Sequence, residues 1–328
     1  MRVVAIGGGT GLSAVLRGLK HHVSEPTRPA QFRPEIARLT AIVTVTDEGG
    51  SSGRLRRDFR MLPPGDIRNC LVALAEDEQL LTQLFNYRFA SGHGLRGHSL
   101  GNLLLTALTN LTHDFAKAVR LSSEVLAIRG EIFPATLSDV HLKATRTDGK
   151  VILGERSITR TRVPIERLQI VPSRCKPVPE TLAAIRHADL ITFGPGSLYT
   201  SLIPNLLVQG IAEEIAQSRA VKVLICNLMT QPGESRGYSA ADHVRALHEH
   251  AGRPVFDHIV LNKRPMSPAL LQRYADEHAA PVELDLDAVR KLGAKPICAN
   301  LLIEDHVARH DSRLLAKLLL SLARRRKR

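Results

Sequence analysis

Three glycine-rich turns, each placed directly after an apolar run, have the residue types of a phosphate-binding site. The first turn follows Val3–Ile6 and contains Gly8, Gly9, Thr10, Gly11 and Leu12. Glycine tolerates positive φ and lets a ligand approach the backbone closely, and a helix that starts at such a turn points N–H groups at an anion. Apolar residues at helical spacing from Leu12 onward predict that helix. The alternative is a tight strand-to-helix turn without a ligand.

The second turn follows the apolar run Leu39–Val45 and starts with two acids, Asp47 and Glu48. The residues after the acids are Gly49, Gly50, Ser51 and Ser52. Serine hydroxyls donate hydrogen bonds to phosphate oxygens, and an acid at a strand end suits a ribose hydroxyl or a divalent cation such as Mg²⁺. The alternative is a flexible loop that is capped by acids and followed by a solvated basic helix.

The third turn follows Leu190–Phe193 and supplies Gly194, Gly196, Ser197 and Thr200. Open α/β sheets bind ligands at the carboxyl ends of their strands, where the three turns would meet. We therefore expect the turns to share one anionic ligand. A later strand, His258–Asn262, ends in an amide that suits a base edge, although asparagine at a strand end is also a common turn former.

Asp66 is a candidate catalytic acid that lies just after a Pro-Pro-Gly interruption. The structural alternatives are that it caps the helix that follows or that it pairs with Arg68. Two histidines in a glycine-rich segment, His93 and His98, lack the spacing of recognised metal-binding motifs. Loop hydrogen bonds and helix capping therefore explain these histidines better than metal binding.

The order of strand-like and helix-like segments predicts the fold that positions these residues. Apolar, β-branched runs such as Leu39–Val45 are typical of parallel strands that are buried on both faces. We predict an α/β fold with a Rossmann-like, doubly wound and mostly parallel sheet, in a single domain over residues 1–328. Residues 120–175 contain alternating patterns and an Asp148-Gly149 turn, which predict a small β-rich insertion.

Composition and charge argue against several classes of protein. The chain carries a net charge of +13, but only 4% of its residues are aromatic, and much of the basic excess lies in residues 54–60 and in the tail, residues 324–328. We expect no specific nucleic-acid binding, and we interpret the tail as a solvated helix end. The four cysteines form no CxxC pair, and no apolar run reaches the about 18 residues of a membrane span. These features predict a cytoplasmic protein without a transmembrane segment.

Seven motifs occur in order over nearly the whole chain. They are IGGGTGLS, TVTDEGGSSGRLRRDF, PPGDIRNC, GHSLGN, FGPGSLYTSLIPNLL, NLMTQPGES and VLNKRP. This series resembles the bacterial gluconeogenesis factor (YvcK) family, whose wider superfamily includes the magnesium-dependent 2-phospho-L-lactate transferase (CofD). The resemblance implies a binder of UDP-sugars, notably UDP-N-acetylglucosamine, that is linked to cell shape and cell-wall metabolism during gluconeogenic growth.

The resemblance also implies positions for the ligand. Residues 8–12, together with Asp47 and residues 49–52, would line the diphosphate part of the pocket, and the third turn would close it. Asn262 and Lys263 would lie near the base or the sugar. Glu48 stands where many relatives carry a second Asp, so any Mg²⁺ would depend mainly on Asp47. The pattern that binds the deazaflavin in the transferase is not evident in this chain.

Three classes of function compete at this stage. A non-catalytic nucleotide-sugar sensor is favoured by the repeated turns and by the lack of a convincing nucleophile and base. Such a sensor would need a regulatory protein partner. We also expect the protein to form a homo-oligomer. A CofD-like, Mg²⁺-dependent transferase is favoured by Asp47 and Asp66 as catalytic residues. An NADP-dependent oxidoreductase is suggested by the Gly-x-Gly-x-x-Ala pattern of residues 9–14, with Ser51, Ser52 and Arg54 near a 2′-phosphate.

Overall fold

Seven parallel strands form the central sheet of the computed structural model, which describes residues 1–24, 35–76 and 79–326. The strands are β1 (Arg2–Gly7), β2 (Arg38–Val43), β3 (Glu131–Pro134), β7 (Leu190–Phe193), β8 (Val221–Ile225), β9 (His258–Asn262) and β10 (Lys295–Ala299). Their spatial order is β10-β9-β8-β7-β1-β2-β3, and every neighbouring pair is parallel. The chain runs outward from β1 to β3, returns to β7 and runs outward to the other edge. The predicted doubly wound sheet is therefore confirmed, with its switch point between β1 and β7.

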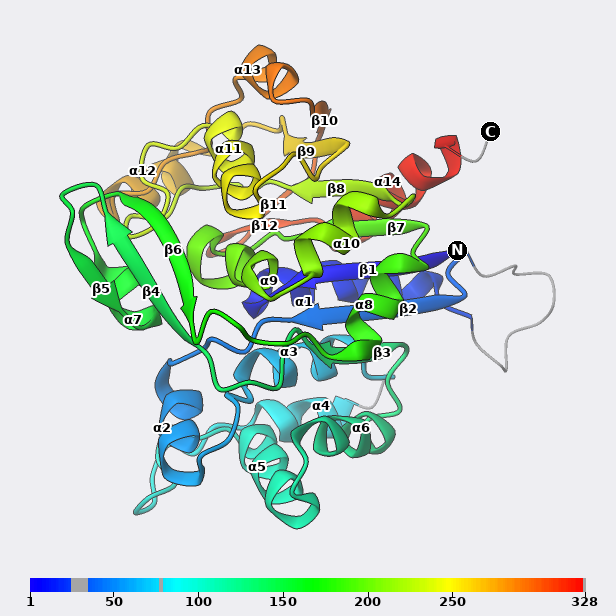
Figure 1. Cartoon of the computed structure of the whole chain (residues 1–328), viewed down its shortest axis with the longest axis vertical. Helices are drawn as coiled ribbons and strands as arrows, with labels where there is room; N and C mark the ends of the chain where they lie inside the picture. The colour runs from blue at the N-terminus through cyan, green and yellow to red at the C-terminus, as the bar shows by residue number, and fades with distance from the viewer. Residues whose placement is uncertain (25–34, 77–78, 327–328) are drawn as a thin grey trace.

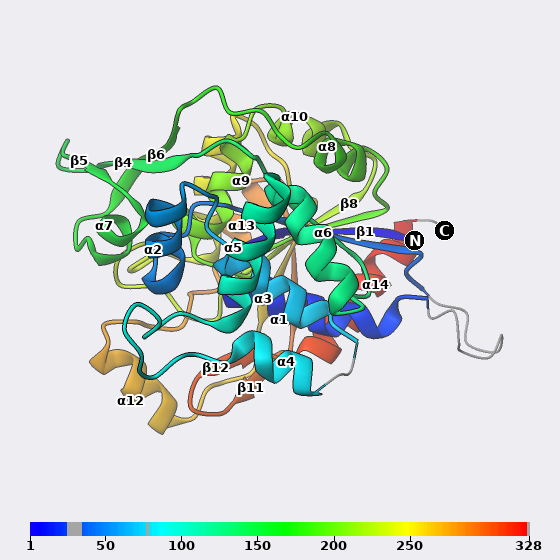
Figure 2. The same cartoon turned by 90° about the horizontal axis from the view of Figure 1, so that it is seen from below.

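Helices cover both faces of this sheet (Figure 1). One face carries α1 (Gly9–Leu19), α3 (Gly65–Leu74) and α14 (Ser312–Arg326). The opposite face carries α8 (Pro179–Arg186), α9 (Ile203–Leu207), α10 (Ile211–Gln217) and α11 (Ala240–Ala251). Figure 2 shows the two helical layers with the sheet between them. The arrangement is that of a three-layer α/β/α domain.

Further helices lie at the two ends of the sheet. Those near β3 are α2 (Gly50–Phe59), α4 (Gln79–Asn86), α5 (Leu100–Thr112) and α6 (Phe115–Val125). The later part of the chain adds α12 (Pro268–Asp276), α13 (Leu286–Lys291) and the short hairpin of β11 (Leu302–Glu304) and β12 (Ala308–His310). A 3-10 turn, η1 (Lys20–His22), follows α1, and a π-helical turn, η2 (Leu198–Leu202), precedes α9.

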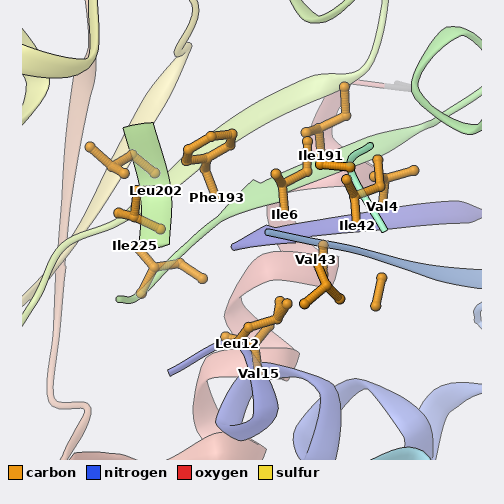
Figure 3. Close-up of a cluster of buried hydrophobic side chains, with 14 of the residues drawn as sticks. Val4, Ile6, Leu12, Val15, Ile42, Val43, Ile191, Phe193, Leu202 and Ile225 are labelled. Atoms are coloured by element: carbon orange, nitrogen blue, oxygen red, sulfur yellow. The ribbon is translucent and has the colours of Figure 1, made fainter. Parts of the chain in front are cut away.

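The core lies between the sheet and the helices that cover it (Figure 3). Val4 and Ile6 of β1 are at most 2% exposed, and so are Leu12 and Val15 of α1. Both faces of β1 and β2 are buried, which explains why their sequences are continuous apolar runs rather than alternating ones. Leu12, predicted as part of the first phosphate-binding turn, packs in this core.

A small antiparallel sheet projects at the end of the molecule opposite the termini (Figure 1, Figure 2). It consists of β4 (His141–Arg146), β5 (Val151–Leu153) and β6 (Ile165–Val171), with α7 (Glu155–Arg160) between the last two strands. The predicted hairpin is present, since β4 pairs antiparallel with β5. The predicted segment 120–175 begins earlier than this sheet: its first part forms the end of α6 and the strand β3, which pairs with β2 of the central sheet.

The basic tail continues the last helix, α14, up to Arg326. Arg324 is exposed and donates to Oε2 of Glu35 at 2.7 Å, and Arg325 is exposed as well. Residues 327 and 328 lie outside the described part of the chain. No helix of the described residues has the length and the apolar character that a membrane span needs, as the sequence predicts.

Candidate functional site

A cleft of about 1040 Å³ lies at the carboxyl ends of the central strands, next to the switch point between β1 and β7. The predicted site residues that line it are Gly8, Gly9, Thr10, Gly11, Asp47, Asp66, Gly196, Ser197 and Thr200. Other polar residues that line it, none of them predicted, are Ser13, Arg17, Asn69, Asn86, Glu155, Ser201, Asn227, Gln231, Tyr274, Arg309 and His310. The first and third turns therefore share one cleft, as expected for an open α/β sheet.

The first and third turns touch each other, and glycine permits the contact. A Cβ atom on Gly11 would lie 2.2 Å from the carbonyl oxygen of Pro195. A Cβ atom on Gly8 would lie 2.7 Å from Oδ2 of Asp66. Both distances are below the 3.0 Å that real Cβ atoms keep from other atoms. The glycines of the first turn thus let a loop and an acid pack against its backbone.

The third turn is held by a buried carboxylate from the loop after β8. Glu234 is 4% exposed, and its Oε2 accepts hydrogen bonds from the N–H groups of Tyr199 and Thr200 at 2.8 and 3.1 Å. Its Oε1 accepts a hydrogen bond from Oγ1 of Thr200 at 2.8 Å. These donors, which a phosphate group would need, are already occupied. This part of the third turn therefore builds the wall of the cleft and does not act as an open phosphate cradle.

Asp47 and Asp66 bond to the first two turns in a similar way. The N–H of Gly49 donates to Oδ1 of Asp47 at 2.7 Å. The N–H of Gly9 donates to the carboxylate of Asp66, at the start of α1. Asp66 lies in the first turn of α3, after the N-cap residue Pro64, so it does not cap its own helix. In each turn predicted to bind phosphate, part of the backbone therefore already donates a hydrogen bond to a carboxylate of the protein.

Three carboxylates, Asp47, Asp66 and Glu155, line the cleft and influence one another. Burial and the charge of Asp47 raise the pKa of Asp66 to about 7. The same two causes raise the pKa of Glu155 to about 8. Glu155 is fixed against the second turn: the N–H of Glu48 donates to its Oε2 at 2.7 Å, and its own N–H donates to Oε2 of Glu48 at 3.1 Å. This part of the cleft attracts protons or a cation.

The raised pKa values predict that the fold loses stability as the pH rises. Asp66 faces Asp47, Glu155 and the cation of Arg68, and its folded pKa lies above the ordinary value of about 4. Between these two values the folded chain binds more protons than the unfolded chain, so the free energy of unfolding decreases with pH from about 4 to about 8. We expect Asp66→Asn to raise the melting temperature more at about pH 8.5 than at about pH 5, in buffer with a metal chelator. An equal shift at both pH values would contradict the raised pKa.

The serines of the second turn lie outside the lining of the cleft. Ser51 is 4% exposed; its Oγ lies 2.9 Å from Nδ1 of His98 and accepts a hydrogen bond from Nδ2 of Asn102 at 3.0 Å. Ser52 is 3% exposed. These contacts join α2 to α5 and to the loop that precedes it. Gly49 and Gly50 are likewise not among the lining residues.

The remaining predicted residues also lie away from the cleft lining. Gly194 precedes the lining residues of the third turn, Asn262 is the last residue of β9, and Lys263 follows it. Oδ1 of Asn262 accepts hydrogen bonds from the N–H groups of Arg264 and Leu301 at 3.2 and 3.0 Å. Its Nδ2 donates to the carbonyl of Arg264 at 2.8 Å. Asn262 is therefore a turn former, the alternative that the sequence also offered.

Two arginines bring positive charge to the cleft. Arg17 lies in the last turn of α1, and Arg309 lies on β12. Burial and then repulsion by Arg309 lower the pKa of Arg17, so the two guanidinium groups are neighbours. Within the described residues, neither guanidinium group forms an ion pair. Cations gathered without a carboxylate are suited to bind an anion.

The spacing of residues along α1 is a sequence signal that identifies one of these two arginines. Thr10, Ala14 and Arg17 all line the cleft, and their spacing of four and three residues places them on one face of α1. Arg309, by contrast, is distant in sequence and belongs to a short hairpin. No pattern in its segment indicates a ligand site.

The predicted metal ligand, Asp47, lies near Asp66, a second carboxylate that suits the same ion. In the described part of the chain, no group of three or more His, Cys, Asp or Glu side chains is arranged to hold a metal ion. Asp47 and Asp66 both line the cleft, however, and repulsion between them raises the pKa of Asp66. Because Mg²⁺ keeps several water ligands, it needs only one or two protein carboxylates. Asp47 and Asp66 are the residues that would hold it.

Comparisons with known proteins give a consistent result. Residues 3–302 match the family model of 2-phospho-L-lactate transferase CofD. The gluconeogenesis factor of Bacillus subtilis (strain 168) is 46% identical over 322 residues, which cover 98% of each chain. The gluconeogenesis factor of Halalkalibacterium halodurans is 48% identical over 319 residues, 97% of this chain and 95% of the relative. A crystal structure of a Bacillus halodurans protein has a TM-score of 0.91 at 47% identity and covers 97% of this chain and 99% of its own.

Proposed function

The chain belongs to the 2-phospho-L-lactate transferase CofD family and, within it, to the gluconeogenesis factors, and from this premise we propose that it binds a UDP-sugar, notably UDP-N-acetylglucosamine. One observation carries the proposal: a single cleft at the switch point of the sheet is lined by the first glycine turn and by two arginines that form no ion pair with any described residue. The guanidinium groups of Arg17 and Arg309 suit a diphosphate. The cleft of about 1040 Å³ has room for a base, a diphosphate and a sugar.

The role that we propose for this binding is regulatory rather than catalytic. Among the described lining residues, no serine, threonine or cysteine is hydrogen-bonded to a histidine, the usual arrangement of an activated nucleophile. We propose a cytoplasmic, homo-oligomeric sensor that acts on a protein partner and links the level of the nucleotide sugar to cell morphology and cell-wall metabolism during gluconeogenic growth. The gluconeogenesis factor name of the relatives supports this role.

A transferase is the second candidate, and the two aspartates favour it. Asp66 has a pKa raised to about 7 by burial and by Asp47, so it can hold or release a proton near neutral pH. When bound, Mg²⁺ would neutralise a phosphate group in transfer, and Asp47 and Asp66 would hold the ion. The NADP alternative has less support, because Ser51 and Ser52 lie outside the cleft lining and Arg54 donates to the carbonyl of Arg96.

We expect UDP-N-acetylglucosamine to raise the melting temperature of the protein, because a ligand that binds only the folded state stabilises it by RT ln(1 + [L]/Kd). Asp47→Asn should weaken this effect or its dependence on Mg²⁺ without unfolding the chain, since the amide keeps the size of the side chain and removes its charge. Melting scans and calorimetry with UDP-N-acetylglucosamine, GDP and NADP measure both effects.

The matched control is Asp287→Asn, which removes one charge at a residue whose side chain is 90% exposed, on α13. A rise in melting temperature with NADP and none with UDP-sugars would contradict the proposed function. If Asp47→Asn lowers stability and leaves affinity and Mg²⁺ response unchanged, Asp47 serves only to cap the second turn.

A further inference from the structure

One buried arginine holds two asparagine side chains that line the cleft. Arg68, on α3, is 9% exposed. Its Nη2 donates to Oδ1 of Asn69 at 2.6 Å, and its Nη1 donates to Oδ1 of Asn86 at 3.0 Å. Asn69 belongs to α3, and Asn86 is the last residue of α4. A single guanidinium group thus joins two helices at the wall of the cleft.

The guanidinium group determines how both amides are oriented. A guanidinium group carries five N–H donors and no acceptor, so an asparagine can face it only with its carbonyl oxygen. The NH₂ groups of Asn69 and Asn86 must then face away from Arg68. Within the described residues, neither Nδ2 atom has a hydrogen-bond partner or belongs to the buried unpaired atoms. Because both residues line the cleft, both NH₂ groups are accessible to a ligand there.

The charges nearby indicate which kind of acceptor these donors would bind. The cation of Arg88 and the carboxylates of Asp66 and Asp47 act electrostatically on Arg68, so these charges lie close to the pair of amides. A second anion at this point would be repelled by both carboxylates when they are ionised. A neutral carbonyl oxygen accepts from an amide NH₂ group without this repulsion. The diphosphate is better placed near Arg17 and Arg309.

We propose that Asn69 and Asn86 form a two-amide site that binds a neutral carbonyl oxygen of the ligand, with Arg68 as the positioning residue that fixes both amides. The inference rests on the proposed function and specifies how the ligand is recognised. A UDP-sugar offers such an oxygen on its uracil base, and UDP-N-acetylglucosamine offers another on its acetyl group. Ligands that lack one of these groups distinguish the two sources.

Asn86→Asp is the deciding variant, because it exchanges a donor for an acceptor of the same shape. The new carboxylate keeps its contact with Arg68 as a charge-assisted hydrogen bond, so the melting temperature should stay the same or rise. The affinity for the ligand should fall at least tenfold, because the new carboxylate and the carbonyl oxygen of the ligand are both acceptors and cannot form a hydrogen bond. A residue with a purely structural role would instead change stability and affinity in the same direction. Asn110→Asp, which adds the same charge on the exposed side of α5, is the matched control.

The experiment is calorimetry of the full chain with UDP, UDP-glucose, UDP-N-acetylglucosamine and GDP, alongside melting scans. If Asn86→Asp loses affinity for all three uridine ligands, the site binds the base. If it loses affinity for UDP-N-acetylglucosamine alone, the site binds the acetyl group. Arg68→Lys keeps the charge, but an ammonium group cannot hold the two carbonyl oxygens in fixed positions as a guanidinium group does. This variant should give an intermediate loss of affinity.

Three results would overturn the inference in different ways. If the unchanged protein binds none of the four probes, the proposed function and this inference both fail. If the unchanged protein binds and both Asn86→Asp and Asn69→Asp stay within twofold of its affinity, only the two-amide site fails. A parallel fall of melting temperature and affinity in Asn86→Asp would also overturn it, because the side chain would then serve the fold alone.

Discussion

Gly11→Ala is expected to abolish ligand binding and to lower the melting temperature of the protein by about 1–4 °C. The added methyl group would lie 2.2 Å from the carbonyl oxygen of Pro195 and 2.7 Å from its carbonyl carbon. Both are backbone atoms, which cannot turn away as a side chain does, so α1 must move from the third turn and the wall of the cleft must open. Such overpacking costs about 1–3 kcal/mol or more. This cost exceeds the roughly 1 kcal/mol that alanine gains over glycine within a helix.

Thr10→Ala is the matched control for stability, because it changes the neighbouring residue of the same helical turn without adding an atom. Thr10 is exposed on the cleft, so this variant should melt close to the unchanged protein. Melting scans and calorimetry with UDP-N-acetylglucosamine test both variants. A melting temperature of Gly11→Ala within about 1 °C of the unchanged protein would mean that the contact between the two turns is not needed, since about 1 kcal/mol already shifts a domain of this size by about 1–2 °C.

The double variant Arg17→Ala/Arg309→Ala is expected to bind UDP-N-acetylglucosamine about 100-fold more weakly. A hydrogen bond to a charged group contributes about 1.5–3 kcal/mol, and about 1.4 kcal/mol corresponds to a tenfold change in affinity. The same variant should melt at an equal or higher temperature. The reason is that the two guanidinium groups repel each other in the ligand-free protein and have no carboxylate partner within the described residues.

The control removes the same charge at two exposed positions outside the cleft lining, Arg57 and Arg253. If Arg57→Ala/Arg253→Ala weakens binding as much as the double variant in the cleft, the effect comes from the net charge of +13 and not from contact with the ligand. Calorimetry at low and high salt concentration separates the two cases, because distant charges are screened most.

The fold could be predicted from the sequence because its main signals are local. Continuous apolar runs such as Leu39–Val45 identify strands that are buried on both faces, and glycine turns between strands and helices mark where each unit ends. The predicted start of the β-rich insertion, residue 120, lies well before the small sheet, which begins at His141. Glu131–Pro134 has the short alternating pattern of a hairpin strand, but it pairs with β2 in the central sheet. Pairing partners that are distant in sequence leave no local signal.

The site was predicted in part for the same reason. Gly8 to Gly11 of the first turn and Gly196, Ser197 and Thr200 of the third line one cleft because β1 and β7 are neighbours and both end there. Ser51 has the same residue type and a similar turn, yet it packs against His98 and Asn102. Only the position of α5 decides this, since it covers the serine with partners that the turn alone does not indicate.

The sequence by itself therefore determined which segments become strands, which turns face the carboxyl edge of the sheet and which acids stand beside them. Only the tertiary structure decided the charge of the cleft. It brings Glu155 of α7 to Asp47, and Arg309 of a distant hairpin to Arg17 on α1. The physical reason is that a pKa, an ion pair or an oriented amide depends on distances between atoms, and residues far apart in the chain acquire those distances only when the layers pack.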